Sequence, residues 1–313
     1  EGDIRAQAGK LLGHVIARFN AGYRKERPAD MPDIAEARVM ELWNEYLEMI
    51  IRPDHKLTVQ QKRRIRYNLK VVLDSVVEYA GAADFHHFLH AFLKWYERGE
   101  ELEPGEAFVL LDTVHFMPFE LFSEEELGRV GRFAIYEADS KEAEVRIAAW
   151  RAFKLITAYQ PSHPCCKDIA ECVMETTVEG DITMTFLQYR VLNNLGYDTE
   201  LQQKALYDRD VVSDIFLDNL KTSTPWIIKA LNIKLLVDQI DHGKYEHILH
   251  IAAHFSNLIK VSEHVVVRHD AGHALLRIIE LLTPDQRNEI SVELVKGLEV
   301  GEYEFSKYIP RYL

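Results

Sequence analysis

Cysteine and long apolar runs are both scarce in this sequence of 313 residues. The three cysteines, Cys165, Cys166 and Cys172, are odd in number and clustered, which excludes a framework of disulfide bonds and favours a reducing compartment such as the cytoplasm. No apolar run approaches the roughly 18 residues that a membrane-spanning helix needs. The first residues also lack the basic and apolar segments of a signal peptide. We therefore expect a cytoplasmic protein without membrane insertion.

Positive charge is also in short supply. The sequence has 37 Lys and Arg residues against 50 Asp and Glu residues, which gives a net charge of −13. Because nucleic-acid binding depends mainly on neutralising phosphates, this balance makes a nucleic-acid partner an unfavoured interpretation. No glycine-rich phosphate loop, nucleophile elbow or Cys/His dyad can be recognised. The sequence therefore predicts no catalytic residue and no cofactor, and enzymatic activity is the less favoured interpretation.

What the sequence does contain is a repeated pattern. An arginine is followed by alanine three and six residues later and by an aliphatic residue ten residues later, at both Arg146–Ile156 and Arg268–Ile278. The two copies are 122 residues apart, or three steps of about 41. The middle apolar positions continue this period with spacings of 41, 39, 40, 41 and 41 residues: Leu69, Leu110, Ala149, Tyr189, Ala230 and Ala271. A period of roughly 20–50 residues is typical of stacked repeats.

The Arg-x-x-Ala-x-x-Ala-Leu pattern resembles the second helix of HEAT and armadillo repeats, and Arg5–Val15 carries a further copy. The resemblance implies an all-α fold, a right-handed superhelix of about seven HEAT-like helix pairs in which residues 1–313 form a single α-solenoid. Ala8 and Leu69 are 61 residues apart, so we expect an irregular insertion at residues 21–57 between the first two units. Because the sequence opens inside a repeat, we also expect a fragment of a longer chain.

Apolar periodicity and capping signals predict individual helices. Ser123 followed by Glu126, for example, is a capping-box signature that opens a helix ending near residue 137. Other predicted helices cover residues 3–20, 33–51, 58–79, 84–97, 165–178, 199–220, 223–240, 243–259, 262–282 and 284–299. No strand pattern accompanies them.

Polar residues on the second helices are candidates for a binding groove. Positions two, five and eight residues after the repeat arginine point away from the core, toward the groove. The residues there, with two arginines close by, are Asn68, Asp112, His115, Arg151, Lys154, Gln188, Arg190, Asn194, Lys229, Asn232, Asp270, His273 and Arg277. We call this set the polar ladder. Its mixture of charges and amides suits a protein or peptide partner better than a phosphate backbone or an apolar ligand.

Histidine is concentrated at residues 242–273, which hold seven of the 14. His247, His250 and His254 share one helix face, and His269 and His273 are four residues apart on the next helix. These five imidazoles are candidate ligands for zinc or another divalent ion, and the alternative is that they are ordinary histidines on a helical hairpin.

Two further clusters suggest metal chemistry less specifically. His269-Asp270 matches the pair found in metal-dependent phosphohydrolases, but it falls inside the repeat pattern. His163 with the three cysteines lacks the spacing of roughly two to four residues that zinc sites favour, so buried structural cysteine is the alternative. The basic run Lys62–Arg66 is a candidate contact for phosphates or an acidic partner, or the solvated flank of a helix.

Three functional hypotheses follow. Helical solenoids are mostly binding scaffolds, so the favoured one is a non-catalytic scaffold that binds a protein or peptide in the groove. The second is a regulatory or sensory segment of a larger multidomain protein. The third is an enzyme built from HEAT-like repeats, by resemblance to some alkylbase DNA glycosylases and phycobilin lyases. The sequence predicts no oligomeric state.

Overall fold

A computed structural model of the chain describes residue 11 and residues 34–52, 69–74, 82–178, 180–207, 218–221, 224–241 and 247–313. Across these ranges every regular element is a helix and no strand is present, which confirms the all-α prediction for the part of the chain described. No helix in the same ranges is long and apolar enough to cross a membrane. Asn68, the basic run Lys62–Arg66 and nearly all of the predicted helix 3–20 lie outside the described residues.

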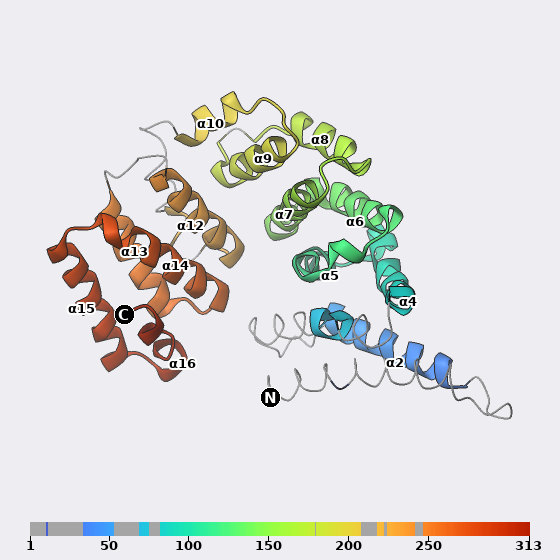
Figure 1. The fold of residues 1–313 in the computed structure, drawn as a ribbon, viewed down its shortest axis with the longest axis horizontal. Helices are drawn as coiled ribbons and strands as arrows, with labels where there is room; N and C mark the ends of the chain where they lie inside the picture. The colour runs from blue at the N-terminus through green and yellow to red at the C-terminus, as the bar shows by residue number, and fades with distance from the viewer. Residues whose placement is uncertain are drawn as a thin grey trace. The chain divides into compact units, whose positions relative to one another are not determined.

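The chain divides into two compact units. The first unit comprises residues 1–176 and 190–197, and the second unit comprises residues 177–189 and 198–313. Helix α9 (Ile182–Asn194) contributes residues to both units. Figure 1 shows the helices of each unit coloured in chain order.

In the first unit, helices that are two apart in the chain pack side by side, which produces two layers (Figure 1). One layer holds α4 (Ala82–Leu93), α6 (Glu124–Tyr136) and α8 (Cys165–Glu175), and the other holds α5 (Pro104–Thr113) and α7 (Ala143–Tyr159). Helix α2 (Ile34–Ile51) packs against α4 and α5. Short 3₁₀ helices lie between these elements: η1 (Lys94–Glu97), η2 (Gly99–Glu101), η3 (Val114–Phe116), η4 (Phe119–Leu121) and η5 (Glu137–Asp139).

The second unit repeats this alternation. Helix α12 (Trp226–Asp241) packs beside α14 (Val265–Ile278), and α13 (Ile248–Val261) packs beside α15 (Pro284–Val300) and against α14. The other elements are α10 (Glu200–Tyr207), η6 (Ile279–Leu281), α16 (Tyr303–Ser306) and η7 (Ile309–Arg311). The predicted helices 223–240, 243–259, 262–282 and 284–299 correspond to α12, α13, α14 with η6, and α15, so their order is confirmed.

The repeat arginine makes the same bond in both strong copies of the pattern. Arg146 donates from Nη1 to the carbonyl of Ser140 at 2.7 Å. Arg268 donates in the same way to the carbonyl of Ser262, and in both cases the acceptor lies six residues before the arginine. Each bond fixes the segment that enters α7 or α14, because a charged donor satisfies a carbonyl just outside the helix. The shared sequence pattern therefore corresponds to a shared local structure.

The middle positions of the pattern face the core, as predicted. Ala149 and Ala271 are 0% exposed, and their small side chains allow neighbouring elements to pack closely there. Leu69 and Leu110 are also 0% exposed and Ala230 is 5% exposed. Tyr189, the sixth position, is partly exposed.

The predicted capping box at the start of α6 is present and is linked to a second helix. Ser123 Oγ accepts from the Glu126 N–H at 3.3 Å, and the Glu126 carboxylate accepts from the Ser123 N–H at 2.8 Å. His86 of α4 reaches the same carboxylate at 2.9 Å. Burial alone would raise the pKa of Glu126, but the hydrogen bonds from Ser123 and His86 outweigh it and lower the pKa. One carboxylate thus caps α6 and holds it to α4.

An aromatic ring near the carboxyl end of the chain fills a space on α14. Gly272 stands at the position that Trp150 occupies in the repeat of α7, where the indole is 0% exposed. A Cβ on Gly272 would collide with the ring of Tyr312, which is 6% exposed and whose hydroxyl is hydrogen-bonded to His269 Nδ1 at 3.0 Å. In the second unit, the space that Trp150 fills on α7 is therefore filled by the ring of Tyr312, a residue 40 positions after Gly272.

Candidate functional site

The polar ladder of the first unit joins neighbouring helices. Arg151 of α7 and Asp112 of α5 are both buried, with Arg151 Nη1 3.8 Å from Asp112 Oδ1. Asn194 of α9 donates to the carbonyl of Lys154 and to Thr157 Oγ1 of α7, each at 3.1 Å. His115, Lys154 and Asn194 are partly exposed. The structure therefore brings these ladder residues together along α5, α7 and the end of α9, and Arg190, also partly exposed, lies one turn before Asn194.

In the second unit, three ladder residues are buried within the helical packing. Asn232 is 0% exposed and donates to Thr183 Oγ1 at 3.1 Å and to the carbonyl of Ile228 at 2.8 Å. Gln188 accepts from Gln202 at 3.2 Å. Lys229 is buried, and burial lowers its pKa. The direct bonds of Asn232 and Gln188 serve packing inside the unit, which the helix face alone did not reveal.

The remaining ladder residues of the second unit are more accessible. Asp270 lies 3.8 Å from Lys234 of α12, measured from Oδ2 to Nζ. Arg277 forms an ion pair with Asp241 of α12, and His273 is exposed. These side chains carry charges of both signs on α14, so the mixed character predicted for the ladder is present there.

The histidines proposed as metal ligands lie on two helices. His247 precedes α13, His250 and His254 lie on it with ring centroids 4.9 Å apart, and His254 has a pKa lowered by burial and by His250. On α14, His269 is bonded to Tyr312, and the His269 and His273 rings are 6.2 Å apart. Among the residues that the structure describes, no group of three or more His, Cys, Asp or Glu side chains is arranged to hold a metal ion. His242 lies outside those residues.

The cysteine cluster is a buried junction between α6 and α8. His163 Nδ1 lies 2.9 Å from Cys165 Sγ and accepts from the Cys165 N–H at 3.1 Å, while His163 Nε2 lies 2.8 Å from the carbonyl of Glu124. The pKa of Cys165 is raised by its hydrogen bond with Cys166 and by burial. A neutral, buried thiol is a poor nucleophile, so this geometry favours the structural interpretation of the cluster.

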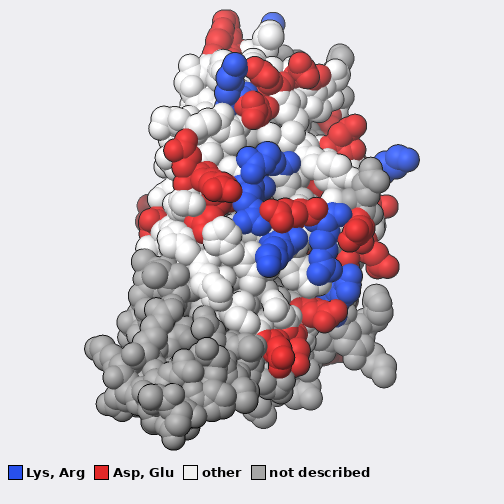
Figure 2. Space-filling view, turned by 90° about the vertical axis from the view of Figure 1, so that its right-hand side faces the viewer, with Lys and Arg blue, Asp and Glu red and all other residues white. Residues whose placement is uncertain are grey.

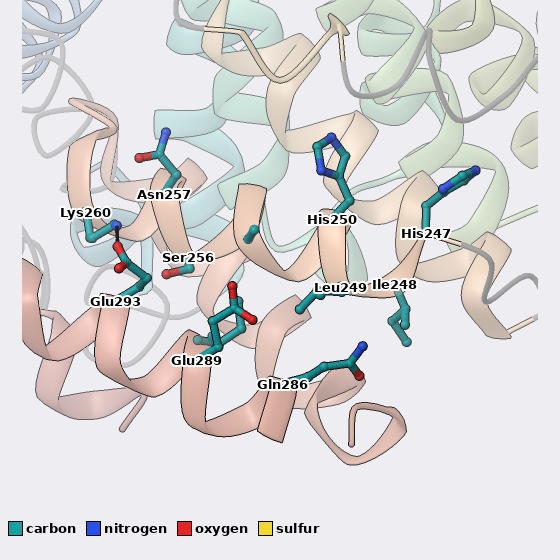
Figure 3. A pocket seen from close by; sticks show the side chains of 12 residues that line it. His247, Ile248, Leu249, His250, Ser256, Asn257, Lys260, Gln286, Glu289 and Glu293 are labelled. Carbon is teal, nitrogen blue, oxygen red and sulfur yellow. Dashed lines mark ion pairs between the residues drawn. The ribbon is translucent and has the colours of Figure 1, made fainter. Parts of the chain in front are cut away.

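A pocket of about 720 Å³ lies between α13 and α15 (Figure 3). It was not predicted from the sequence. Helix α13 and the residue before it supply His247, Ile248, Leu249, His250, Ala253, Ser256, Asn257 and Lys260, and α15 supplies Gln286, Glu289, Ile290 and Glu293. The volume is within the range of about 300–1,000 Å³ that small-molecule sites occupy. None of these residues except the two histidines stood out in the sequence, because the pocket depends on how two helices are spaced.

Charges of both signs are mixed on the face viewed in Figure 2, which is the right-hand side of Figure 1, where α4 and α6 lie. Lys and Arg side chains gather near its middle, with Asp and Glu side chains around and between them. Arg129 of α6 lies 2.6 Å from a carboxylate oxygen of Glu97. The described residues visible on this face therefore carry charges of both signs close together.

The chain matches no protein-family model and no curated protein sequence. Its function must therefore be inferred from the arrangement of its own residues.

Proposed function

We propose that the chain is a HEAT-type repeat protein, a right-handed superhelix of helix pairs that serves as a non-catalytic scaffold in the cytoplasm. It binds a polar protein or peptide along the second helices of its repeats. The observation that supports this proposal is the continuity of the polar ladder across α5, α7 and the end of α9.

Several side chains of the polar ladder are held in place by burial and hydrogen bonds, which favours binding. Asp112 and Arg151 are buried, and the amide of Asn194 is fixed by two acceptors on α7. His115 lies on η3, directly after α5, and Lys154 lies on α7. Both side chains are partly exposed. A partner that contacts side chains anchored by such a framework loses less conformational entropy on binding than one that must order a mobile surface.

The chemistry of the accessible residues indicates the kind of partner. An imidazole, an amine, an amide and a guanidinium provide both donors and acceptors over one continuous surface. Main-chain amides and polar side chains of a peptide can match such a surface, whereas an apolar ligand would leave these groups unsatisfied.

The test is a paired set of surface variants. We would capture a partner from the source cell with the wild-type chain, purify it, and measure its affinity for His115→Ala/Lys154→Ala. The matched control is His87→Ala/Lys167→Ala, which removes one histidine and one lysine from exposed positions of the other layer, on α4 and α8. We expect the ladder variant to bind at least about tenfold more weakly, since two polar contacts are lost, and the control to bind normally.

Circular dichroism of both variants would establish that the helices are intact. If the ladder variant keeps full affinity, or if the control loses as much, the partner does not bind along the second helices.

A further inference from the structure

The lining of the pocket between α13 and α15 includes a buried serine hydroxyl, that of Ser256. Ser256 is 2% exposed, and its Oγ makes no hydrogen bond to any residue that the structure describes. A serine inside a helix commonly donates to a carbonyl of the preceding turn, so this hydroxyl is unusual. Figure 3 shows Ser256 on the side of α13 that faces α15, and Glu289, Lys260 and Glu293 line the same pocket. Ser256, which belongs to the lining of the pocket, thus holds a buried hydroxyl that the described residues leave unsatisfied, and a bound polar ligand would explain it.

The charges around Ser256 define the sign of that ligand. Lys260 Nζ lies 3.6 Å from Glu293, and the stem of Lys260 lies against Gly297, where a Cβ would be 2.8 Å from Lys260 Cδ. Glu293 also pairs at 2.8 Å with Lys296, whose side chain is 61% exposed and outside the pocket lining. Lys260 is therefore held against one carboxylate. Glu289, the second carboxylate of the lining, has no ion pair within the described part of the chain.

The other lining groups are compatible with a ligand that is positively charged and donates hydrogen bonds. Asn257 and Gln286 also belong to the lining, and the oxygen of an amide side chain can accept a hydrogen bond. Ile248, Leu249 and Ile290 supply apolar surface that can contact a methylene chain. The charge of the whole chain, −13, would also attract a cation to the site.

We propose that this pocket binds a primary ammonium group carried on an aliphatic chain, with the ammonium between Glu289 and Ser256 Oγ. Two sources provide this chemistry, a free polyamine and a lysine side chain of a peptide. The lining comes from α13, the residue before it and α15, none of which carries a residue of the polar ladder, so the proposal does not depend on the scaffold function.

Calorimetric titration of the wild-type protein would use two probes, spermidine and a capped tripeptide with a central lysine. The same peptide with norleucine at the centre keeps the carbon chain and removes the charge. We expect saturable binding of at least one charged probe and none of the norleucine peptide. Tighter binding of spermidine would identify a polyamine site, and tighter binding of the lysine peptide would identify a peptide site.

Variants separate the pocket from general attraction to an acidic protein. Glu289→Gln should weaken binding about tenfold or more, because it removes a charged partner of the ammonium. Glu299→Gln makes the same charge change at an exposed position of α15 outside the lining, and should change the affinity less than about twofold, as expected for a screened surface charge.

Ser256→Ala tests the hydroxyl through two measurements, the melting temperature and the affinity for the ammonium, which a purely structural serine would not affect in opposite ways. The substitution removes an unsatisfied hydroxyl, so the unliganded variant should melt at the same temperature as the wild type or higher, while its affinity for the ammonium falls. The proposal is overturned if neither charged probe binds saturably, if Glu289→Gln and Glu299→Gln weaken binding equally, or if Ser256→Ala lowers the melting temperature without affecting affinity.

Discussion

Replacing Gly272 with alanine should destabilise the protein, although alanine is the better helix former. Gly272 lies inside α14, where the same substitution at an unobstructed position would stabilise the helix by about 1 kcal/mol. Here a Cβ would collide with the ring of Tyr312. The protein can relieve that collision only by moving Tyr312 and the segment that carries it.

The cost of moving Tyr312 follows from its burial. The side chain is 6% exposed, and a buried aromatic residue removes about 150–250 Å² from water. At about 25 cal/mol per Å², full release would cost about 4–6 kcal/mol as an upper estimate, and the lost bond to His269 adds about 1 kcal/mol. Partial resettling of the ring reduces this sum, and the helix gain opposes it, so we expect Gly272→Ala to lose about 2–4 kcal/mol.

Urea denaturation followed by far-ultraviolet circular dichroism can measure this loss in a double-mutant cycle. In a Tyr312→Ala background the collision is absent, so Gly272→Ala should then stabilise the protein by about 1 kcal/mol. The effect of the same substitution thus changes sign between the two backgrounds. If Gly272→Ala stabilises both, the tyrosine ring does not occupy the space at Gly272 and our account of this packing is wrong.

Three further outcomes are expected. Ala149→Asp and Ala271→Asp each place an unpaired charge at a position that is 0% exposed, which should cost at least about 3 kcal/mol; unchanged melting temperatures would show that the repeat register is wrong. Arg146→Met keeps the aliphatic stem but loses the bond to a carbonyl, and thermal melting should report a loss of about 1–2 kcal/mol. The pKa of Glu126 in the folded state is below its ordinary 4.5. The ionised carboxylate therefore stabilises the folded state above pH 4.5, and this contribution is lost as the pH falls through the folded-state pKa. Glu126→Gln should therefore flatten the stability profile as the pH falls below 4.5, and a profile parallel to the wild type would contradict the assignment.

The period of the sequence predicted the helices because packing between helices recurs with that period. Ala149 and Ala271 are fully buried at equivalent places, and Leu69 and Leu110 are buried at the corresponding positions of other helices, so the same place of the pattern faces the core each time. The capping box is likewise a local arrangement, specified by Ser123 and Glu126 three positions apart. Features that depend on a few adjacent residues, or on a rule shared by all repeats, could therefore be read from the sequence.

Features that depend on one particular neighbour could not be read in this way. Asn232 points toward a helix that carries Thr183, 49 residues away, and only that neighbour makes it a buried residue rather than a groove residue. The pocket beside Ser256 likewise depends on the spacing of α13 and α15. The sequence around Gly272 likewise does not indicate that the ring of Tyr312 packs against this glycine. Each of these depends on tertiary contacts specific to one place in the chain.

The buried amide of Asn232 has a consequence for folding as well as for packing, because particular neighbours satisfy it. Helices that recur every 40 residues or so have similar apolar faces, so a helix can dock on the wrong neighbour while the chain folds. The amide of Asn232 is satisfied by Thr183, by the carbonyl of Ile228 and by Asn219. A different neighbour would leave donors buried without acceptors, which costs about 1–3 kcal/mol each. We therefore expect the native arrangement to be favoured over incorrect docking, and Asn232→Leu to slow the recovery of native protein after dilution from urea even where the final fold is equally stable.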